Sequence, residues 1–268
     1  MLSKTSRWLA YTTALLYGVT GFWLYVFPEP IAPVFAWKVT PFMSMTIGGW
    51  ALGNAWLAYL AARRWAWSRV YTTLLYLWLF GISEMMVVFF FRDKLALAHP
   101  IAWLYLSTLV INVITALAGM ADWLRLRPSI HREGRQVQPL HRWLALAFVL
   151  FVGFLGIYGL TAQIGWPGTN GGIFPEVMSL FTLRSFGAFY FSLALAALPF
   201  LWEKNLETVL HHGFAAFGLI AFVTIAAFAY LRLFDFSARP GGILYIAVYL
   251  LVGIPLLFAF RKLGFGNA

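Results

Sequence analysis

Eight long apolar segments restrict the fold of this sequence more than any other feature. Each has about 20 residues, enough for a helix rising about 1.5 Å per residue to cross a hydrocarbon layer about 30 Å thick. None alternates apolar and polar residues as a transmembrane β-strand would. The sequence therefore predicts an all-α integral membrane protein with eight transmembrane helices, at residues 8–27, 43–62, 70–91, 100–121, 143–164, 178–202, 210–230 and 242–260.

The composition agrees with a membrane protein and excludes several other classes. Hydrophobic residues make up 62% of the chain and charged residues 10%, whereas soluble domains are roughly 45–50% apolar and about 25% charged. The net charge of +10 does not indicate nucleic-acid binding, because the basic residues stand at the ends of apolar segments and form no patch. The chain has no cysteine, which excludes disulfides, thiolate metal ligands and cysteine nucleophiles.

The distribution of lysine and arginine predicts the orientation. Of the 19 basic residues, 13 fall in loops on one side of the membrane and 6 on the other. Because such charges remain cytoplasmic, the richer side is the inner one. Both termini are therefore predicted to be cytoplasmic, in the plasma membrane or, in a prokaryote, the inner membrane. The 13 residues are Lys4, Arg7, Arg63, Arg64, Arg69, Arg125, Arg127, Arg132, Arg135, Arg142, Lys204, Arg261 and Lys262.

An internal repeat divides the chain into two parallel four-helix halves, residues 1–121 and 143–268, joined by a basic cytoplasmic hinge at 122–142. Each half contains an even number of segments and so enters and leaves on the same side, as in transporters built from parallel repeats. Three groups carry the repeat. Trp8, Gly18 and Gly21 recur 135 residues later, where Trp23 is matched by Tyr158. Gly48, Gly49 and Gly53 recur as small residues 139 later, and Arg92, Pro100, Leu104 and Tyr105 recur 140 later.

The second helix of each half carries small residues four apart. Gly49 and Gly53 form this stripe in the first half, and Ala188, Ser192 and Ala196 form it in the second. Small residues at this spacing let two helix backbones approach closely in a membrane. The stripes predict either packing inside each half or a central contact between the two second helices.

Four polar residues lie inside the predicted spans and form the first candidate site. Glu84 and Arg184 are charged, and Asn54 and Asn112 are amides. A charge in hydrocarbon costs at least about 2.5 kcal/mol, so it marks a site unless it has a structural role. Glu84 and Arg184 are predicted at matching depths, facing one interior space and paired directly, through water or through an anionic ligand group. The alternatives are a purely structural pair or an arginine that extends to the interface.

A second group of charged residues lies at the predicted outer ends of the spans. Arg92, Arg232 and Asp235 are candidate ligand-binding residues at the rim of an outward-facing vestibule, together with Asp93, Arg239 and Glu176. The alternative is that they anchor helix ends at the interface. The glycine-rich segment 165–175 is predicted to be mobile or to act as a lid.

No motif points to catalysis, to a cofactor or to a metal. The five histidines stand at predicted span ends or in the hinge, and no nucleotide-binding, zinc-hydrolase or serine-hydrolase motif occurs. Adjacent His211 and His212 would point about 100° apart on a helix. We therefore predict no catalytic residues, no metal site and no cofactor.

Three functions remain open. The first is non-enzymatic binding or transport of a small molecule or a lipid headgroup at an outward-facing polar site between the repeats. The second is a non-catalytic subunit or assembly factor that binds other membrane-protein subunits, which the 19% aromatic content favours. The third is a membrane enzyme acting on lipids, which the lack of catalytic residues disfavours. The predicted partners are the lipid bilayer and a small anionic ligand or headgroup, and not nucleic acid.

Overall fold

The computed structural model describes residues 1–130, 136–170 and 176–263, and over these residues it is helical and has no β-strand. Parts of the predicted hinge (131–135), of the glycine-rich segment (171–175) and of the second half (264–268) lie outside the described residues. The long helices are α1 Lys4–Val26, α3 Pro41–Arg64, α4 Trp67–Phe90, α5 Pro100–Leu126, α6 Pro139–Thr161, α7 Leu180–Ala197, α8 Leu206–Ala229 and α9 Gly241–Leu263. The short ones are α2 Pro28–Ile31, η1 Ala32–Val34, η2 Arg92–Lys94, η3 Leu198–Leu201 and η4 Leu231–Leu233.

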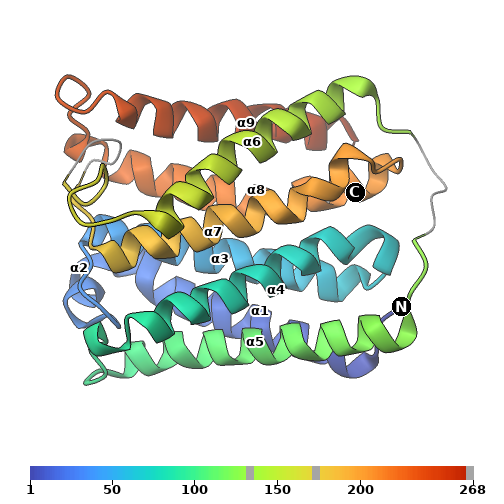
Figure 1. The fold of residues 1–268 in the computed structure, drawn as a ribbon, viewed down its shortest axis with the longest axis horizontal. Coiled ribbons are helices and arrows are strands. Elements are labelled where there is room, and N and C mark those ends of the chain that lie inside the picture. Colours follow the sequence, from blue (N-terminus) through green and yellow to red (C-terminus); the bar gives the residue numbers. More distant parts are fainter. Residues whose placement is uncertain (131–135, 171–175, 264–268) are drawn as a thin grey trace.

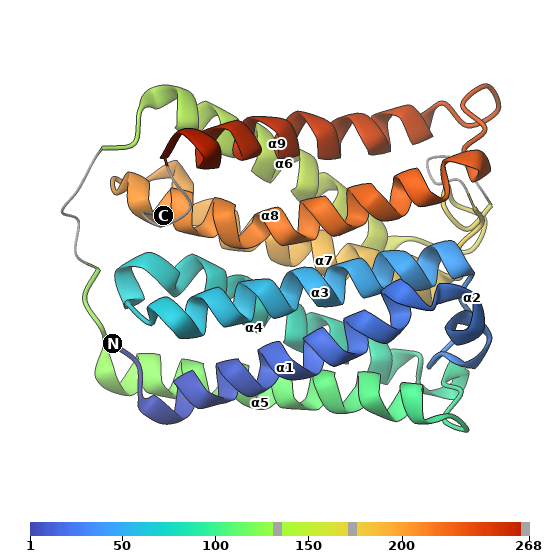
Figure 2. The same cartoon turned by 180° about the vertical axis from the view of Figure 1, so that it is seen from behind.

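The long helices form two layers that lie back to back (Figures 1 and 2). One layer holds α5, α4, α7 and α6 side by side, and the other holds α1, α3, α8 and α9 in the same order. Helices α3, α4, α7 and α8 therefore make up the centre, while α1 and α5 lie at one edge and α6 and α9 at the other. The first turn of α1, the last turn of α9 and the connection from α5 to α6 lie at the same end of the bundle (Figure 1).

Local sequence signals determine where the helices begin. The side chains of Ser3, Thr40, Ser179 and Asn205 each accept a hydrogen bond from a backbone N–H of the first turn, which satisfies a donor that the helix itself cannot pair. Prolines stand in the first turns of α3, α5 and α6, where the missing N–H has no consequence. The Asn205 cap starts α8 four residues before the predicted segment at 210.

Seven of the long helices within the described residues are long and apolar enough to cross a membrane. The chain is therefore a multi-pass helical membrane protein. The remaining one, α3, has 24 residues, but glycines, aromatic residues and Asn54 make it less apolar than the others. Most of α3 is buried at the centre of the bundle, so protein rather than lipid surrounds it.

Glycines bring neighbouring helices into close contact. A Cβ added to Gly21 of α1 would lie 2.7 Å from the backbone of Leu52 in α3, and one added to Gly156 of α6 would lie 2.5 Å from the backbone of Phe191 in α7. The Gly49–Gly53 stripe instead meets α8, where a Cβ on Gly53 would lie 2.5 Å from the Leu219 side chain. On α3 the small-residue stripe therefore packs against α8. It does not make the predicted central contact with α7, the second helix of the other half.

The polar hinge is shorter than the sequence indicated, because α5 continues to Leu126 and α6 already begins at Pro139. Asp122 belongs to the last turns of α5, and its Oδ2 accepts hydrogen bonds from Ser3 and, at 2.6 Å, from the Ser6 hydroxyl. The carboxylate thus ties the end of α5 to the start of α1. Negative charge beside a helix N-terminus is also favoured by the helix dipole.

Candidate functional site

A buried carboxylate lies at the centre of the first half. Glu84, in α4, is 1% exposed, and its Oε1 accepts a hydrogen bond of 2.8 Å from the Tyr105 hydroxyl of α5. The Ser185 hydroxyl of α7 also lies near this carboxylate, but Oε2 makes no hydrogen bond of standard geometry in the described part of the chain. A buried carboxylate oxygen without a partner is energetically unfavourable, which makes this side chain a site candidate and not only a helix contact.

Glu84 lines a small cavity enclosed mainly by aromatic rings. The cavity has a volume of about 20 Å³, slightly above the ~10–15 Å³ that a single water needs. Rings from five segments surround it, and the amide of Asn54 and the hydroxyl of Ser185 complete the polar part of the wall. The aromatic lining consists of Tyr17, Trp37, Trp50, Phe80 and Tyr105.

The segment 35–37, between η1 and α3, contributes the Trp37 ring to the wall of this cavity. Phe35 and Trp37 are 1% and 2% exposed, although they belong to a loop. The Trp37 ring stacks on Phe181 at 4.2 Å, and its Nε1–H donates to the Thr182 hydroxyl at 3.0 Å. These contacts hold the loop of the first half against α7 of the second. We call Phe35, Ala36 and Trp37 the plug.

The two predicted amides belong to the same buried region. Asn54 Oδ1 accepts a hydrogen bond of 2.9 Å from the Tyr76 hydroxyl, and Asn112 Nδ2 donates to the Tyr17 hydroxyl at 2.8 Å and to the Leu77 carbonyl. Asn54 Nδ2 and Asn112 Oδ1 have no partner among the described residues. Asn54 lines the Glu84 cavity directly, whereas Asn112 lies behind Tyr17.

Three polar contacts join α1 to α5 along their lengths. Thr13 and Thr115 pair at 2.8 Å, Tyr17 accepts from Asn112 at 2.8 Å, and Thr20 and Thr108 pair at 2.8 Å. We call these contacts the α1–α5 ladder. Sequence reasoning found only Asn112, although the spacing of Thr13, Tyr17 and Thr20 places all three on one helix face and was an available signal.

The structure does not bring Arg184 to Glu84. The Arg184 Nη2 donates to the Ala162 carbonyl at the end of α6, at 2.9 Å, and no ion pair between the two charges occurs among the described residues. The side chain that reaches the Glu84 cavity from this turn of α7 is the next one, Ser185. Because successive helical residues point about 100° apart, Arg184 is directed elsewhere.

The outer charged residues do not gather around the cavity. Arg92 lies over the Phe89 ring at 5.0 Å, and Asp235 accepts hydrogen bonds from Ser237 and Ala238 within its own turn. Arg232 lines a separate open groove of about 420 Å³ with Glu29 and Tyr230. Glu176 accepts a hydrogen bond from Thr40, and burial raises its pKa above the ordinary value.

Two further polar residues lie deeper than the sequence indicated. The earlier start of α8 places His211 and His212 inside the helix, where they are 3% and 6% exposed. His212 Nδ1 lies 3.5 Å from the Thr73 hydroxyl, and neither ring nitrogen of His211 has a partner in the described residues. Across the described ranges, no group of three or more histidine, aspartate or glutamate residues is placed to hold a metal.

Comparison of the chain with family models, with curated proteins and with solved structures finds no match. The class of the protein is therefore argued from its fold and from the buried region alone. They define a multi-pass, all-helical membrane protein with a carboxylate-containing cavity among its central helices.

Proposed function

We propose that this chain is a non-enzymatic membrane protein that binds a small ligand at Glu84 and moves it across the plasma membrane. One observation carries the proposal: a carboxylate 1% exposed within a membrane-spanning helix, with one oxygen that makes no hydrogen bond of standard geometry and a water-sized cavity beside it. An ionisable group at membrane depth is costly and usually functional. A purely structural glutamate would be expected to have both oxygens hydrogen-bonded.

The chemistry of the wall favours a small monovalent cation, such as an alkali ion or ammonium. The cavity combines a carboxylate with aromatic rings, whose faces attract positive charge. No lysine or arginine lines it, so the anionic ligand expected from a Glu84–Arg184 pair has no matching charge here. A cation would supply the partner that Glu84 Oε2 lacks and would offset the desolvation of the carboxylate.

The arrangement of the helices supports two parallel repeats around this site. If residues 1–121 and 143–268 are repeats, α3 corresponds to α7 and α4 corresponds to α8. The contact of α3 with α8 is then equivalent to that of α4 with α7. The close approaches at Gly21 and Gly156 are equivalent in the same way. The site lies near the contact between the halves, and the plug joins them at its outer end. In the predicted orientation, with cytoplasmic termini, the structure is then a closed state of an outward-facing site.

Binding is tested by following thermal unfolding of the purified protein in detergent during titration with sodium, potassium or ammonium chloride at constant ionic strength. A ligand that binds only the folded state raises the midpoint as its concentration exceeds Kd. We expect one cation to stabilise the wild type and Glu207→Gln, whose carboxylate pairs with Arg69 at the surface, but not Glu84→Gln. The proposal fails if no cation stabilises the wild type or if Glu84→Gln responds equally.

Transport is tested separately in liposomes that contain the purified protein, with a radioactive form of the cation identified by binding. Flux in the wild type that Glu84→Gln abolishes supports movement across the membrane. Binding without flux would leave a ligand-binding protein and remove the transport part of the proposal.

A second candidate, a subunit of a larger membrane complex, is favoured by the helices at one edge. Only 17% of the apolar window of α6 and 11% of that of α9 are buried within the chain, which leaves a large surface for another subunit. Mild solubilisation followed by affinity purification tests this candidate, because a subunit would retain a partner in fixed stoichiometry.

A further inference from the structure

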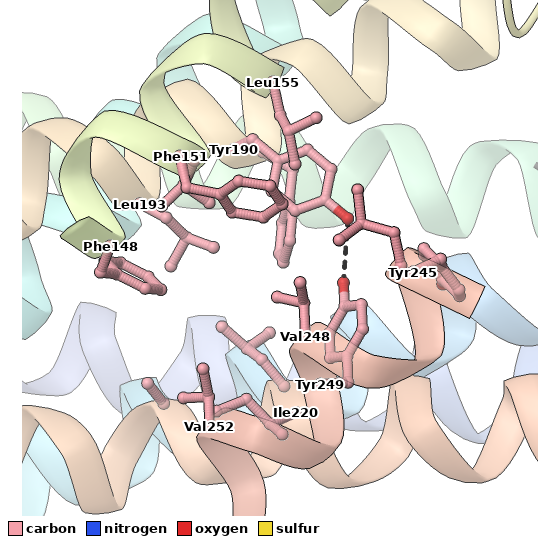
Figure 3. A pocket seen from close by; sticks show the side chains of 15 residues that line it. Phe148, Phe151, Leu155, Tyr190, Leu193, Ile220, Tyr245, Val248, Tyr249 and Val252 are labelled. Carbon is pink, nitrogen blue, oxygen red and sulfur yellow. Dashed lines mark hydrogen bonds between the residues drawn. The ribbon is translucent and has the colours of Figure 1, made fainter. Parts of the chain in front are cut away.

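The second half contains an apolar pocket at the place that corresponds, at the spacings of the predicted repeat, to the Glu84 cavity of the first half. It lies among α6, α7, α8 and α9, with a volume of about 110 Å³. Figure 3 shows side chains from α6, such as Phe148 and Leu155, facing Val248 and Val252 of α9 across this space. Helix α6 packs on α7 and α9 packs on α8, but α6 and α9 make no extensive contact with each other.

The pocket offers almost nothing to water. Its wall is formed by aliphatic and aromatic side chains, and the hydroxyls of Tyr190 and Tyr249, which lie at its edge, pair with each other at 3.0 Å (Figure 3). A water in a cavity needs about two to four polar partners, and apolar cavities of about 150 Å³ remain dry and take up small apolar molecules. The wall of this pocket therefore suits an apolar group and not water.

The predicted repeat explains why this space is open. Thr13, Tyr17 and Thr20, which hold α1 against α5, correspond at a spacing of 135 to Phe148, Val152 and Leu155. All three of these residues line the pocket. On the facing side, Thr108 and Asn112 correspond at a spacing of 140 to Val248 and Val252, which also line it. Where the first half has the α1–α5 ladder, the second half has apolar side chains and an open volume.

We propose that this pocket holds a segment of hydrocarbon chain, the tail of a membrane lipid, that takes the place of the ladder between α6 and α9. The volume admits a few methylene groups or one branched isoprenoid unit and is far too small for a helix of a partner protein. The occupant comes from the membrane, because α6 and α9 are the least buried helices. Moving a tail from the lipid into the pocket gives no general hydrophobic gain, because the lipid is itself apolar. The pocket therefore selects a tail by its shape.

Photolabelling of the purified protein in detergent micelles tests the proposal. One probe is a phosphatidylcholine with a diazirine in its acyl tail, and the other is a diazirine-bearing polyprenol. Adducts are mapped by mass spectrometry while the mole fraction of the probe is raised. We expect adducts at the pocket to saturate, whereas adducts at Leu251, which is 73% exposed on α9, rise in proportion to the probe. Saturation with only one probe identifies acyl or isoprenoid tails, and saturation with both identifies hydrocarbon in general.

Two variants supply the control. Val152→Phe fills the pocket from α6, and Val248→Phe fills it from α9 in case the first does not fold. Val110→Phe makes the same change on α5 at a position 47% exposed. Pocket adducts should fall at least several-fold in either filled variant and remain in Val110→Phe. The proposal is overturned if pocket adducts are absent, if they rise in proportion like those at Leu251, or if the filled variants retain them.

Discussion

The hydroxyl of Tyr105 lies 2.8 Å from Oε1 of Glu84, and both side chains are buried between α4 and α5. This contact satisfies one oxygen of a carboxylate that also lines a water-sized cavity. It also links the candidate site to the packing of α5, since Tyr105 contacts the plug ring of Trp37 edge-on at 5.3 Å.

Tyr105→Phe should destabilise the protein by about 1–3 kcal/mol, because it leaves a buried carboxylate oxygen without its donor. The measurement is unfolding in detergent, followed by tryptophan fluorescence. Tyr59→Phe, at a position 39% exposed, is the matched control and should change stability little. Equal effects of the two substitutions would show that the Tyr105–Glu84 contact contributes nothing to stability.

Gly53→Ala should also destabilise the protein, by about 1–3 kcal/mol, because the added methyl group would press on both the backbone and the side chain of Leu219 and overpack the contact. Gly18→Ala is the control, since its Cβ would meet Ala55 at an ordinary 3.8 Å. Alanine there should be neutral or stabilising, because it is the better helix former. The comparison fails if both variants unfold at the same midpoint.

Trp37→Ala should open the outer end of the cavity. The chain has no cysteine, so Ser185→Cys places a single thiol at the cavity wall. A thiol reagent that cannot cross the membrane, added outside, should modify this cysteine slowly in the parent and at least several-fold faster with Trp37→Ala. Trp166→Ala, at a loop position 40% exposed, should leave the rate unchanged. An unchanged rate with Trp37→Ala would mean that the plug does not control access.

Protein stability should depend on the ionisation of Glu176. Burial raises the pKa of this carboxyl above its ordinary value of 4.5, so the folded state favours the protonated form. The contribution of the protonated Glu176 carboxyl to stability is therefore fully present below about pH 4.5. It is lost as the pH rises through the pKa that this carboxyl has in the folded state. The wild type should lose stability relative to Glu176→Gln over that range in paired unfolding titrations. Parallel pH profiles would contradict this prediction.

The predicted orientation can be tested with two single-cysteine variants. Ala98→Cys lies in the connection before α5, and Ser129→Cys lies in the connection after it, at the opposite end of the bundle; both positions are exposed. On intact cells, an impermeant thiol reagent should label Ala98→Cys and not Ser129→Cys until the membrane is opened. The reverse pattern would invert the orientation, because the arginine-rich connection would then be external.

The sequence predicted where the helices lie but not how their polar side chains meet. Apolar length and helix caps are local properties, so each long helix overlaps a predicted segment, although several ends differ by a few residues. The partner of Glu84 is not local: Tyr105 is 21 residues away, and Trp37 reaches the site from a loop. Depth alone suggested a pair of Glu84 with Arg184, but a one-residue change in helical phase directs Ser185 to the cavity instead. The position of a residue along its helix can be predicted from the sequence, whereas the direction in which its side chain points around the helix depends on how the helices pack.

The modest apolarity of α3 has a consequence for biosynthesis. Its glycine face is covered by α8, which the ribosome produces only after α4, α5, α6 and α7. Until then Gly53 lacks the helix that covers it, and a helix with polar groups partitions weakly into lipid. Nascent α3 should therefore stay beside the insertion machinery until the second half arrives, so that chains truncated before α8 are the forms that quality control removes.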